Sequence, residues 1–311
     1  MSHSTQPAAS HAAPLAASEP GAARRGAGWR TVFGIFKLRI SVLIMATALG
    51  GLFIVPDGSV APVQALVLAL SVLLASASAG AFNQFVEADS DRLMARTRNR
   101  AFASGALPRS AGWLLAIAAL LVFAVSLAAW VVNLAAAGFV LLGALTYAGV
   151  YTLGLKRRTP WNIVIGGLAG SFAVLAGAAA VNPQVGPLAL LLATVLFLWT
   201  PPHFWSLAIA NEAQYAAAGV PMLPVVVGHA RAARIVHGST IALVTVSLLP
   251  VFFGAGWIVF VGALAGGVHF LRKTHALALR PSRQTAMAAF FASMVQLSAL
   301  LAAVVVDAAL R

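Results

Sequence analysis

Nine mostly apolar stretches follow one another along the chain, separated by short segments that hold most of the charged residues. An α-helix needs about 20 such residues to cross roughly 30 Å of hydrocarbon. Each stretch is therefore predicted to be a membrane-spanning helix, which makes the chain an all-α membrane protein. The predicted spans are 34–55, 62–86, 111–131, 134–155, 161–181, 187–210, 235–254, 257–271 and 285–306.

The composition supports this interpretation. Hydrophobic residues make up 61% of the 311 residues and charged residues 9%, whereas soluble domains carry about 25% charged residues. A soluble enzyme and a disordered chain are both excluded. The chain has no cysteine, so disulfides, thiolate nucleophiles and cysteine-bound metals are excluded as well.

The net charge of +13 does not indicate a nucleic-acid partner, because the basic residues lie in clusters between the apolar spans. Their placement indicates the membrane topology instead. With a cytoplasmic N-terminus, 19 of the 20 Lys and Arg residues fall on the cytoplasmic side, and Arg311 is the exception. The positive-inside rule thus predicts that the N-terminus is inside and the C-terminus outside. Residues 1–30 are rich in Ala, Ser, Gly and Pro and are predicted to be a disordered cytoplasmic tail before a single domain, 31–311.

The predicted outer loops are very short, whereas two inner loops run to about 20 residues. Long loops between packed helices tend to carry function. The first of them follows a polar helix end in which Asn83, Glu87 and Asp91 share one face, while Asp89 points away. Oxygen ligands without His or Cys suit Mg²⁺, which binds through one or two carboxylates plus substrate phosphates. The alternative is a solvated helix end whose acids pair with nearby arginines.

The stretch from Asn83 to Asp91 resembles the Asn-x-x-x-Asp-x-x-x-Asp motif of the UbiA superfamily of intramembrane prenyltransferases, with Glu87 in place of the middle Asp. The following Met94, Arg96, Thr97 and Arg100 are similar to a continuation found in its heme-modifying branch, the heme O synthases or protoheme IX farnesyltransferases.

Three further segments resemble that branch: Tyr151 to Gly167 with Lys-Arg and Asn-Ile-Val-Ile-Gly-Gly, Trp199 to Trp205 with Trp-Thr-Pro-Pro-His-Phe-Trp, and Gly219 to Gly228 with Pro-Met-Leu-Pro-Val-Val. The resemblance implies a UbiA-type bundle that transfers a farnesyl group from farnesyl diphosphate to a vinyl group of heme B. Water addition then gives heme O for terminal oxidase assembly. It also implies a bacterial inner-membrane location with a cytoplasmic active site, and heme A synthase or oxidase-assembly partners.

The resemblance also implies roles for individual residues. Asn83, Glu87 and Asp91 would hold Mg²⁺ on the diphosphate, and Mg²⁺ would be the cofactor while heme B is a substrate. The implied catalytic residues are Asn83, Glu87, Asp91, Arg96, Arg100, Lys156 and Arg157. The implied substrate-binding residues are His203, Trp199, Trp205, Tyr151, Asn162 and Tyr215.

Two of these assignments have plainer alternatives. Pro201 and Pro202 are expected to kink or break their helix and so to aim His203 at a flat substrate, but His203 could equally be a hydrogen-bonded histidine beside a packing kink. Lys156 and Arg157 could be topology determinants rather than diphosphate ligands.

The chain also departs from the branch. The acidic pair expected before Tyr215 is replaced by Asn211-Glu212-Ala213-Gln214, so the second acidic motif is degraded. Glu212 could take over the missing role. Two alternatives for function stay open: a UbiA-type enzyme acting on a quinone precursor or chlorin, and a noncatalytic heme carrier or transporter, since broken helices and buried charges also mark transport.

Overall fold

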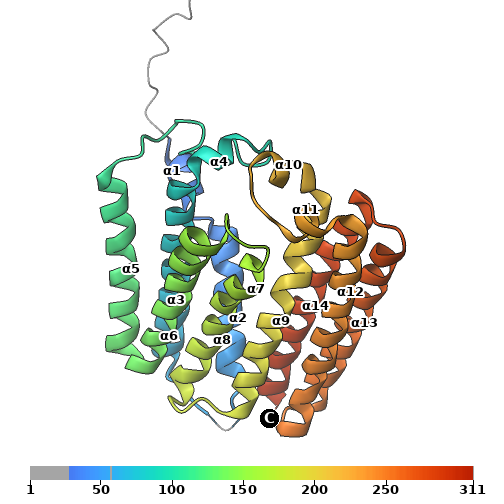
Figure 1. Ribbon diagram of the computed structural model, residues 1–311. Coiled ribbons are helices and arrows are strands. Elements are labelled where there is room, and N and C mark those ends of the chain that lie inside the picture. Colours follow the sequence, from blue (N-terminus) through green and yellow to red (C-terminus); the bar gives the residue numbers. More distant parts are fainter. Residues whose placement is uncertain (1–27, 57, 311) are drawn as a thin grey trace, which may run out of the picture.

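The computed structural model describes residues 28–56 and 58–310, and every regular element in that part of the chain is helical (Figure 1). Residues 1–27 of the predicted tail lie outside the described residues, and the first helix begins at Trp29. The fold is therefore an all-helical bundle, as predicted.

Helices occupy all nine predicted ranges of the described chain. They are α2 (Leu38–Phe53), α3 (Pro62–Val86), α5 (Ala111–Val131), α6 (Leu134–Leu145) continued by the π-helix η1 (Thr146–Leu155), α7 (Asn162–Gly166) with α8 (Leu168–Val181), α9 (Pro187–Ala210), α12 (His229–Leu248) with the 3₁₀ helix η2 (Leu249–Phe253), α13 (Trp257–Leu279) and α14 (Arg283–Leu310). Short helices flank them: α1 (Trp29–Ile35), α4 (Ala88–Arg92), α10 (Glu212–Ala217) and α11 (Leu223–Val227).

Seven of these helical segments are long and apolar enough to cross a membrane, or eight if α1 and α2, bent by 44° at their junction, count as one span. The protein is thus an integral membrane protein. Within the described residues α13 does not meet this test, because its apolar stretch 257–271 is short and the helix beyond it carries Arg272 and Lys273.

The helices form two packed groups. One contains α2, α3, α5, α6 and α8, and the other contains α9, α12, α13 and α14. The groups meet where α8 and α2 contact α9 and where α14 contacts α2. Figure 1 shows α4, α10 and α11 gathered at one end of the bundle, which we call the α4 end, and α14 finishing at the opposite end.

Close approach of α2 and α8 depends on two glycines that the sequence analysis did not single out. A Cβ atom on Gly51 or on Gly177 would overlap the backbone of the other helix. Two glycines four residues apart in the sequence differ in their surroundings: Gly166 lies against the ring of Tyr151, whereas the space around Gly170 is open.

The expected break in the helix at Pro201 and Pro202 is wrong, since α9 runs through both prolines as one helix. Proline removes backbone donors and leaves the carbonyls one turn earlier without their usual partners. The prolines free the carbonyls of Phe197 and Leu198, while nearby Thr200 Oγ1 donates to Leu196 O at 3.0 Å and Ser206 Oγ donates to Pro202 O at 2.7 Å.

Candidate functional site

The acidic motif lies at the α4 end of the bundle, across the junction of α3 and α4. Glu87 separates the two helices, but the backbone N–H groups of Glu87 and Asp91 still donate to the carbonyls four residues earlier, at 3.0 and 2.8 Å. Helical spacing therefore continues through the junction, and Asn83, Glu87 and Asp91 are all buried, at 2%, 2% and 1% exposure. Asp89 is exposed and pairs with Arg92 and Arg109, which confirms that it points away.

Each of the three motif residues contacts a cationic side chain from another part of the chain. Lys37 Nζ donates to Asn83 Oδ1. Lys156 Nζ lies 2.5 Å from Glu87 Oε2, and Arg100 Nη1 donates to both carboxylate oxygens of Asp91 at 3.0 and 2.8 Å. The structure thus brings Lys156 and Arg100 to the motif, in agreement with their predicted place in the site.

The facing segment is the π-helix η1. Thr152 accepts a hydrogen bond from Asn83 Nδ2 at 3.1 Å and donates to Tyr147 O, five residues earlier, at 2.8 Å. Asn83, near the end of α3, therefore contacts Thr152 of η1. Four residues later in each segment, Glu87 contacts Lys156, which directly follows η1. π-Helical turns occur frequently at functional sites, but the hydrophobic pattern of 134–155 predicted only a continuous span.

Lys37, like Thr152 and Tyr147, is a site residue that the sequence analysis did not indicate. It stands between α1 and α2 in a left-handed conformation, with φ of 48°. Its ammonium lies 3.4 Å from the Tyr147 hydroxyl and 5.8 Å from the centre of that ring. The charges of Glu87, Asp91, Arg100 and Lys156 all act on the Lys37 ammonium, which makes it part of one charged cluster. A signal was available: a lysine inside a predicted apolar span is rare unless it has a partner.

The remaining basic candidates lie at the rim. Arg157 is exposed, and its guanidinium donates to Ser90 Oγ at 3.0 Å. Arg96 is exposed as well, and its backbone N–H donates to Gln214 Oε1 at 3.3 Å, which joins the two long loops. Glu212, the expected substitute for the degraded second motif, pairs with His229 at 3.3 Å.

His203 and Trp199 pack against α14. The His203 ring stacks on Trp199 and Phe290, with centroids 4.1 and 4.5 Å apart. His203 Nδ1 lies 2.6 Å from Ser293 Oγ, and Trp199 Nε1 donates to Ser293 O at 2.8 Å. In the described part of the chain, no hydrogen bond joins either residue to the acidic motif. These contacts are as consistent with a histidine that only packs and hydrogen-bonds between α9 and α14 as with a histidine that contacts a flat substrate.

The other aromatic and amide candidates divide into two groups. Tyr151 stacks on Tyr147 with ring centroids 5.5 Å apart, and the Lys156 ammonium lies 5.7 Å from the Tyr151 ring, so Tyr151 belongs to the charged cluster. Tyr215, Asn162 and Trp205 are buried. Asn162 Nδ2 donates to Thr159 O at 2.6 Å, and within the described residues Asn162 Oδ1 and Trp205 Nε1 have no hydrogen-bond partner.

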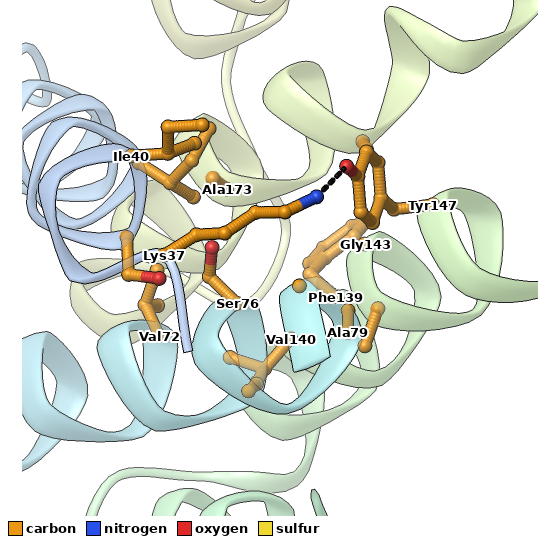
Figure 2. A pocket seen from close by; sticks show the side chains of 16 residues that line it. Lys37, Ile40, Val72, Ser76, Ala79, Phe139, Val140, Gly143, Tyr147 and Ala173 are labelled. Carbon is orange, nitrogen blue, oxygen red and sulfur yellow. Dashed lines mark hydrogen bonds between the residues drawn. The ribbon is translucent and has the colours of Figure 1, made fainter. Parts of the chain in front are cut away.

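An apolar groove runs from the charged cluster into the bundle between α2, α3, α6 and α8 (Figure 2). Lys37 and Tyr147 lie at its end nearest Asn83, and the sticks in Figure 2 show the Lys37 side chain extending through the groove toward the Tyr147 hydroxyl. Most of the other lining residues are small or aliphatic. They are Ile40, Ser41, Ile44, Val72, Ala75, Ser76, Ala79, Gly80, Phe139, Val140, Gly143, Ala144, Ala169 and Ala173.

The donor set of the motif fits a divalent cation that is shared with a phosphate. Residues 28–56 and 58–310 contain no group of three or more His, Cys, Asp or Glu side chains that could hold a metal by themselves. The motif supplies two carboxylates and one amide oxygen. Lys156 contacts one oxygen of Glu87, and a carboxylate has about four lone-pair sites, so oxygens remain for a cation whose other ligands come from phosphate and water.

Comparison with known proteins identifies relatives along almost the whole chain. A protein of Paramagnetospirillum magneticum named protoheme IX farnesyltransferase 2 is 54% identical over 283 residues, which is 90% of this chain and 98% of the relative. The protoheme IX farnesyltransferase of Hahella chejuensis is 40% identical, covering 90% of this chain and 94% of the relative.

Solved structures show the same fold at low identity. A digeranylgeranylglyceryl phosphate synthase superposes with a TM-score of 0.73 at 18% identity, covering 90% of this chain and 98% of the other. A UbiA homologue from Archaeoglobus fulgidus, solved with DMAPP and Mg²⁺, superposes with a TM-score of 0.64 at 15% identity, covering 86% of this chain and 99% of the other. The UbiA prenyltransferase family matches residues 44–295. The chain therefore belongs to the UbiA prenyltransferase family and is an enzyme that transfers a prenyl group.

Proposed function

We propose that this enzyme transfers the farnesyl group of farnesyl diphosphate to a vinyl group of heme B, with addition of water, to give heme O for terminal oxidase assembly. The observation that carries the proposal is the buried cluster of Asn83, Glu87 and Asp91, each held by a cation, at the mouth of an apolar groove. A prenyl diphosphate has the same two parts, an anionic head and an apolar chain.

The cluster suits an anionic head because its cations outnumber its acids. Lys37, Lys156 and Arg100 face only two carboxylates, Glu87 and Asp91. Exposed Arg96 and Arg157 add positive charge at the rim. In a buried site such an excess attracts an anion strongly, because the surroundings screen it weakly.

Asn83, Glu87 and Asp91 are the residues that would hold Mg²⁺ against the diphosphate, an assignment supported by the donor set and by the DMAPP and Mg²⁺ of the Archaeoglobus homologue. When bound, the cation would offset charge on the leaving diphosphate. The basic side chains of the protein would also offset charge on the leaving diphosphate. Lys156 and Lys37 can turn from Glu87 and Asn83 to the phosphate oxygens, and Arg100 holds Asp91 in place.

The groove would hold the farnesyl chain. Its wall residue Ile40 is 55% exposed on the outside of α2, so the chain has a route into the groove from the bilayer. With the head at the cluster and the chain in the groove, the allylic carbon lies near Tyr147 and Tyr151, whose stacked rings can stabilise positive charge.

The reaction needs no protein nucleophile. The allylic C–O bond breaks, and its electron pair leaves with the diphosphate. The π electrons of the heme vinyl group form the new C–C bond, and water captures the resulting cation and loses a proton. For the acceptor we propose contacts with His203, Trp199, Trp205, Asn162 and Tyr215, on the support of the heme-specific segments and of the relatives' names.

The topology belongs to the same proposal. We place the α4 end in the cytoplasm of a bacterial inner membrane, with nine crossings that include α13. The described basic clusters around Arg30, Arg92, Lys156, Arg231 and Arg272 all belong to the segments that the positive-inside rule assigns to the cytoplasm. Reporter fusions after Val132 and after Leu310 should both report a periplasmic location, and a cytoplasmic signal from either would overturn this topology.

The test of the reaction is a product assay. Purified protein in lipid nanodiscs, given heme B, farnesyl diphosphate and Mg²⁺, should yield heme O by mass spectrometry. Quinone-precursor and chlorin acceptors are supplied in parallel. A product formed only with one of those acceptors would replace the heme assignment, and heme binding without any product would favour a carrier.

A further inference from the structure

Along α3 and α6 the groove is lined by small residues near the charged cluster and by larger ones farther from it. Along α3 and α6 the lining side chains nearest the charged cluster are Ala79, Gly80, Gly143 and Ala144. The lining residues at the opposite end, farther along each helix from the cluster, are Ile44, Val72 and Phe139. A chain that enters beside Lys37 and follows α3 and α6 therefore passes small side chains before it reaches Val72 and Phe139.

Phe139 is the largest of the three residues at the far end, and its position is fixed. Its ring stacks on Phe172 of α8, with centroids 6.2 Å apart and planes at 26°. It also packs against the core cluster that contains Val72 and Val140. The ring is thus held as a wall between α6 and α8 rather than left free to swing aside.

The distance from the cluster to this wall matches an isoprenoid of intermediate length. Val72 precedes Asn83 by eleven residues on α3, which corresponds to roughly 16 Å along the helix axis. An extended chain of three isoprene units has about this length, whereas a chain of four units is longer.

We propose that Phe139 is the residue that sets prenyl chain length in this enzyme, by closing the groove after three isoprene units. This inference rests on the proposed function, because it takes the groove to be the prenyl site. Phenyl has six carbons and an isoprene unit five, so removal of the ring opens space for about one more unit. A hydrophobic pocket discriminates by such differences in size.

The experiment compares geranyl, farnesyl and geranylgeranyl diphosphate on the full-length enzyme with heme B. Phe139→Ala should raise the ratio of geranylgeranyl to farnesyl product by roughly tenfold or more relative to the wild type. Phe139→Trp should instead raise the ratio of geranyl to farnesyl product. The matched control is Phe123→Ala, which removes an exposed phenyl from α5 and should leave both ratios unchanged. Active Phe139 variants with wild-type ratios would overturn the proposal.

Val72→Phe provides a second test from the opposite wall, where the added bulk should favour geranyl diphosphate as Phe139→Trp does. It also covers the case in which a Phe139 variant does not fold. Binding of each diphosphate is measured without acceptor by competition with a labelled farnesyl diphosphate. If the wild type binds farnesyl diphosphate but never prenylates heme, the proposed function fails. If the Phe139 and Val72 variants bind the three prenyl diphosphates with the same relative affinities as the wild type, Phe139 does not set chain length, whichever acceptor the enzyme uses.

Discussion

The ammonium of Lys37 donates a hydrogen bond to the amide oxygen of Asn83, which stands 46 residues later in the chain. This contact joins the break between α1 and α2 to the acidic motif at the end of α3. It also places a positive charge at the point where the apolar groove begins. Under the proposed function, the phosphate nearest the prenyl chain would lie at this position or contact Lys37 there.

Lys37→Met should therefore lower kcat/KM for farnesyl diphosphate by about a hundredfold, because one positive group facing the leaving diphosphate is lost. Arg39→Met removes an exposed positive charge two residues away and serves as the control. Steady-state kinetics of both variants check the expectation. A Lys37 variant with an unchanged kcat/KM would remove Lys37 from the site.

Asp91→Asn should reduce turnover by about a hundredfold or more while the protein still folds, because the amide keeps the shape of the side chain but loses its charge. Asp89→Asn is a matched control on the same helix, since Asp89 is exposed and pairs only with surface arginines in the described chain. Turnover is measured together with the amount of folded protein. Equal turnover in the two variants would reject the metal role of Asp91.

Gly166→Ala should destabilise the site, because a Cβ there would lie 2.8 Å from Cδ2 of Tyr151. Overpacking of this kind costs about 1 to 3 kcal/mol. Gly170→Ala, where nothing lies within 4 Å, should be neutral or slightly stabilising because alanine favours helix. Thermal unfolding in detergent compares the two, and a lower Tm for Gly170→Ala than for Gly166→Ala would contradict the packing described for Tyr151.

His203→Ala distinguishes substrate contact from packing. If the imidazole contacts heme, KM for heme B should rise about tenfold while KM for farnesyl diphosphate stays constant. Ser293→Ala removes the hydrogen-bond partner of His203 but keeps the ring, so it should have a smaller effect on heme. If His203→Ala and Ser293→Ala lower Tm equally, and if KM rises for heme B and for farnesyl diphosphate alike, His203 serves packing between α9 and α14.

The sequence was sufficient to predict the helical bundle and the shared face of Asn83, Glu87 and Asp91. Both depend on local periodicity, which the backbone hydrogen bonds of Glu87 and Asp91 preserve across the helix junction. The contacts of Arg100 and Lys156 with that face agree with the predicted site. The roles of the site residues remain predictions until the variants are measured.

Other features could not be predicted because they depend on tertiary packing. The π-helical turn at Thr152 places its side chain toward Asn83, and hydrophobic periodicity does not distinguish such a turn from an α-helix. The continuity of α9 through Pro201 and Pro202 goes against the tendency of proline to break a helix, so the two prolines alone do not predict it. The contact of Lys37 with Asn83 could not be predicted because a lysine near the cytoplasmic end of a span is also typical of a topology determinant.

The π-helix has a consequence for how this region tolerates change. A π-helix holds about one more residue in a turn than an α-helix, so deletion of a single residue between Thr146 and Leu155 would favour α-helical hydrogen bonding in this segment. The hydrogen bonds between residues five apart would then be lost, among them the bond from the Lys156 N–H to Tyr151 O at 3.0 Å. The number of residues in η1 therefore matters for the site in its own right, besides the side chains of Tyr147, Tyr151 and Thr152 that the π-helix carries.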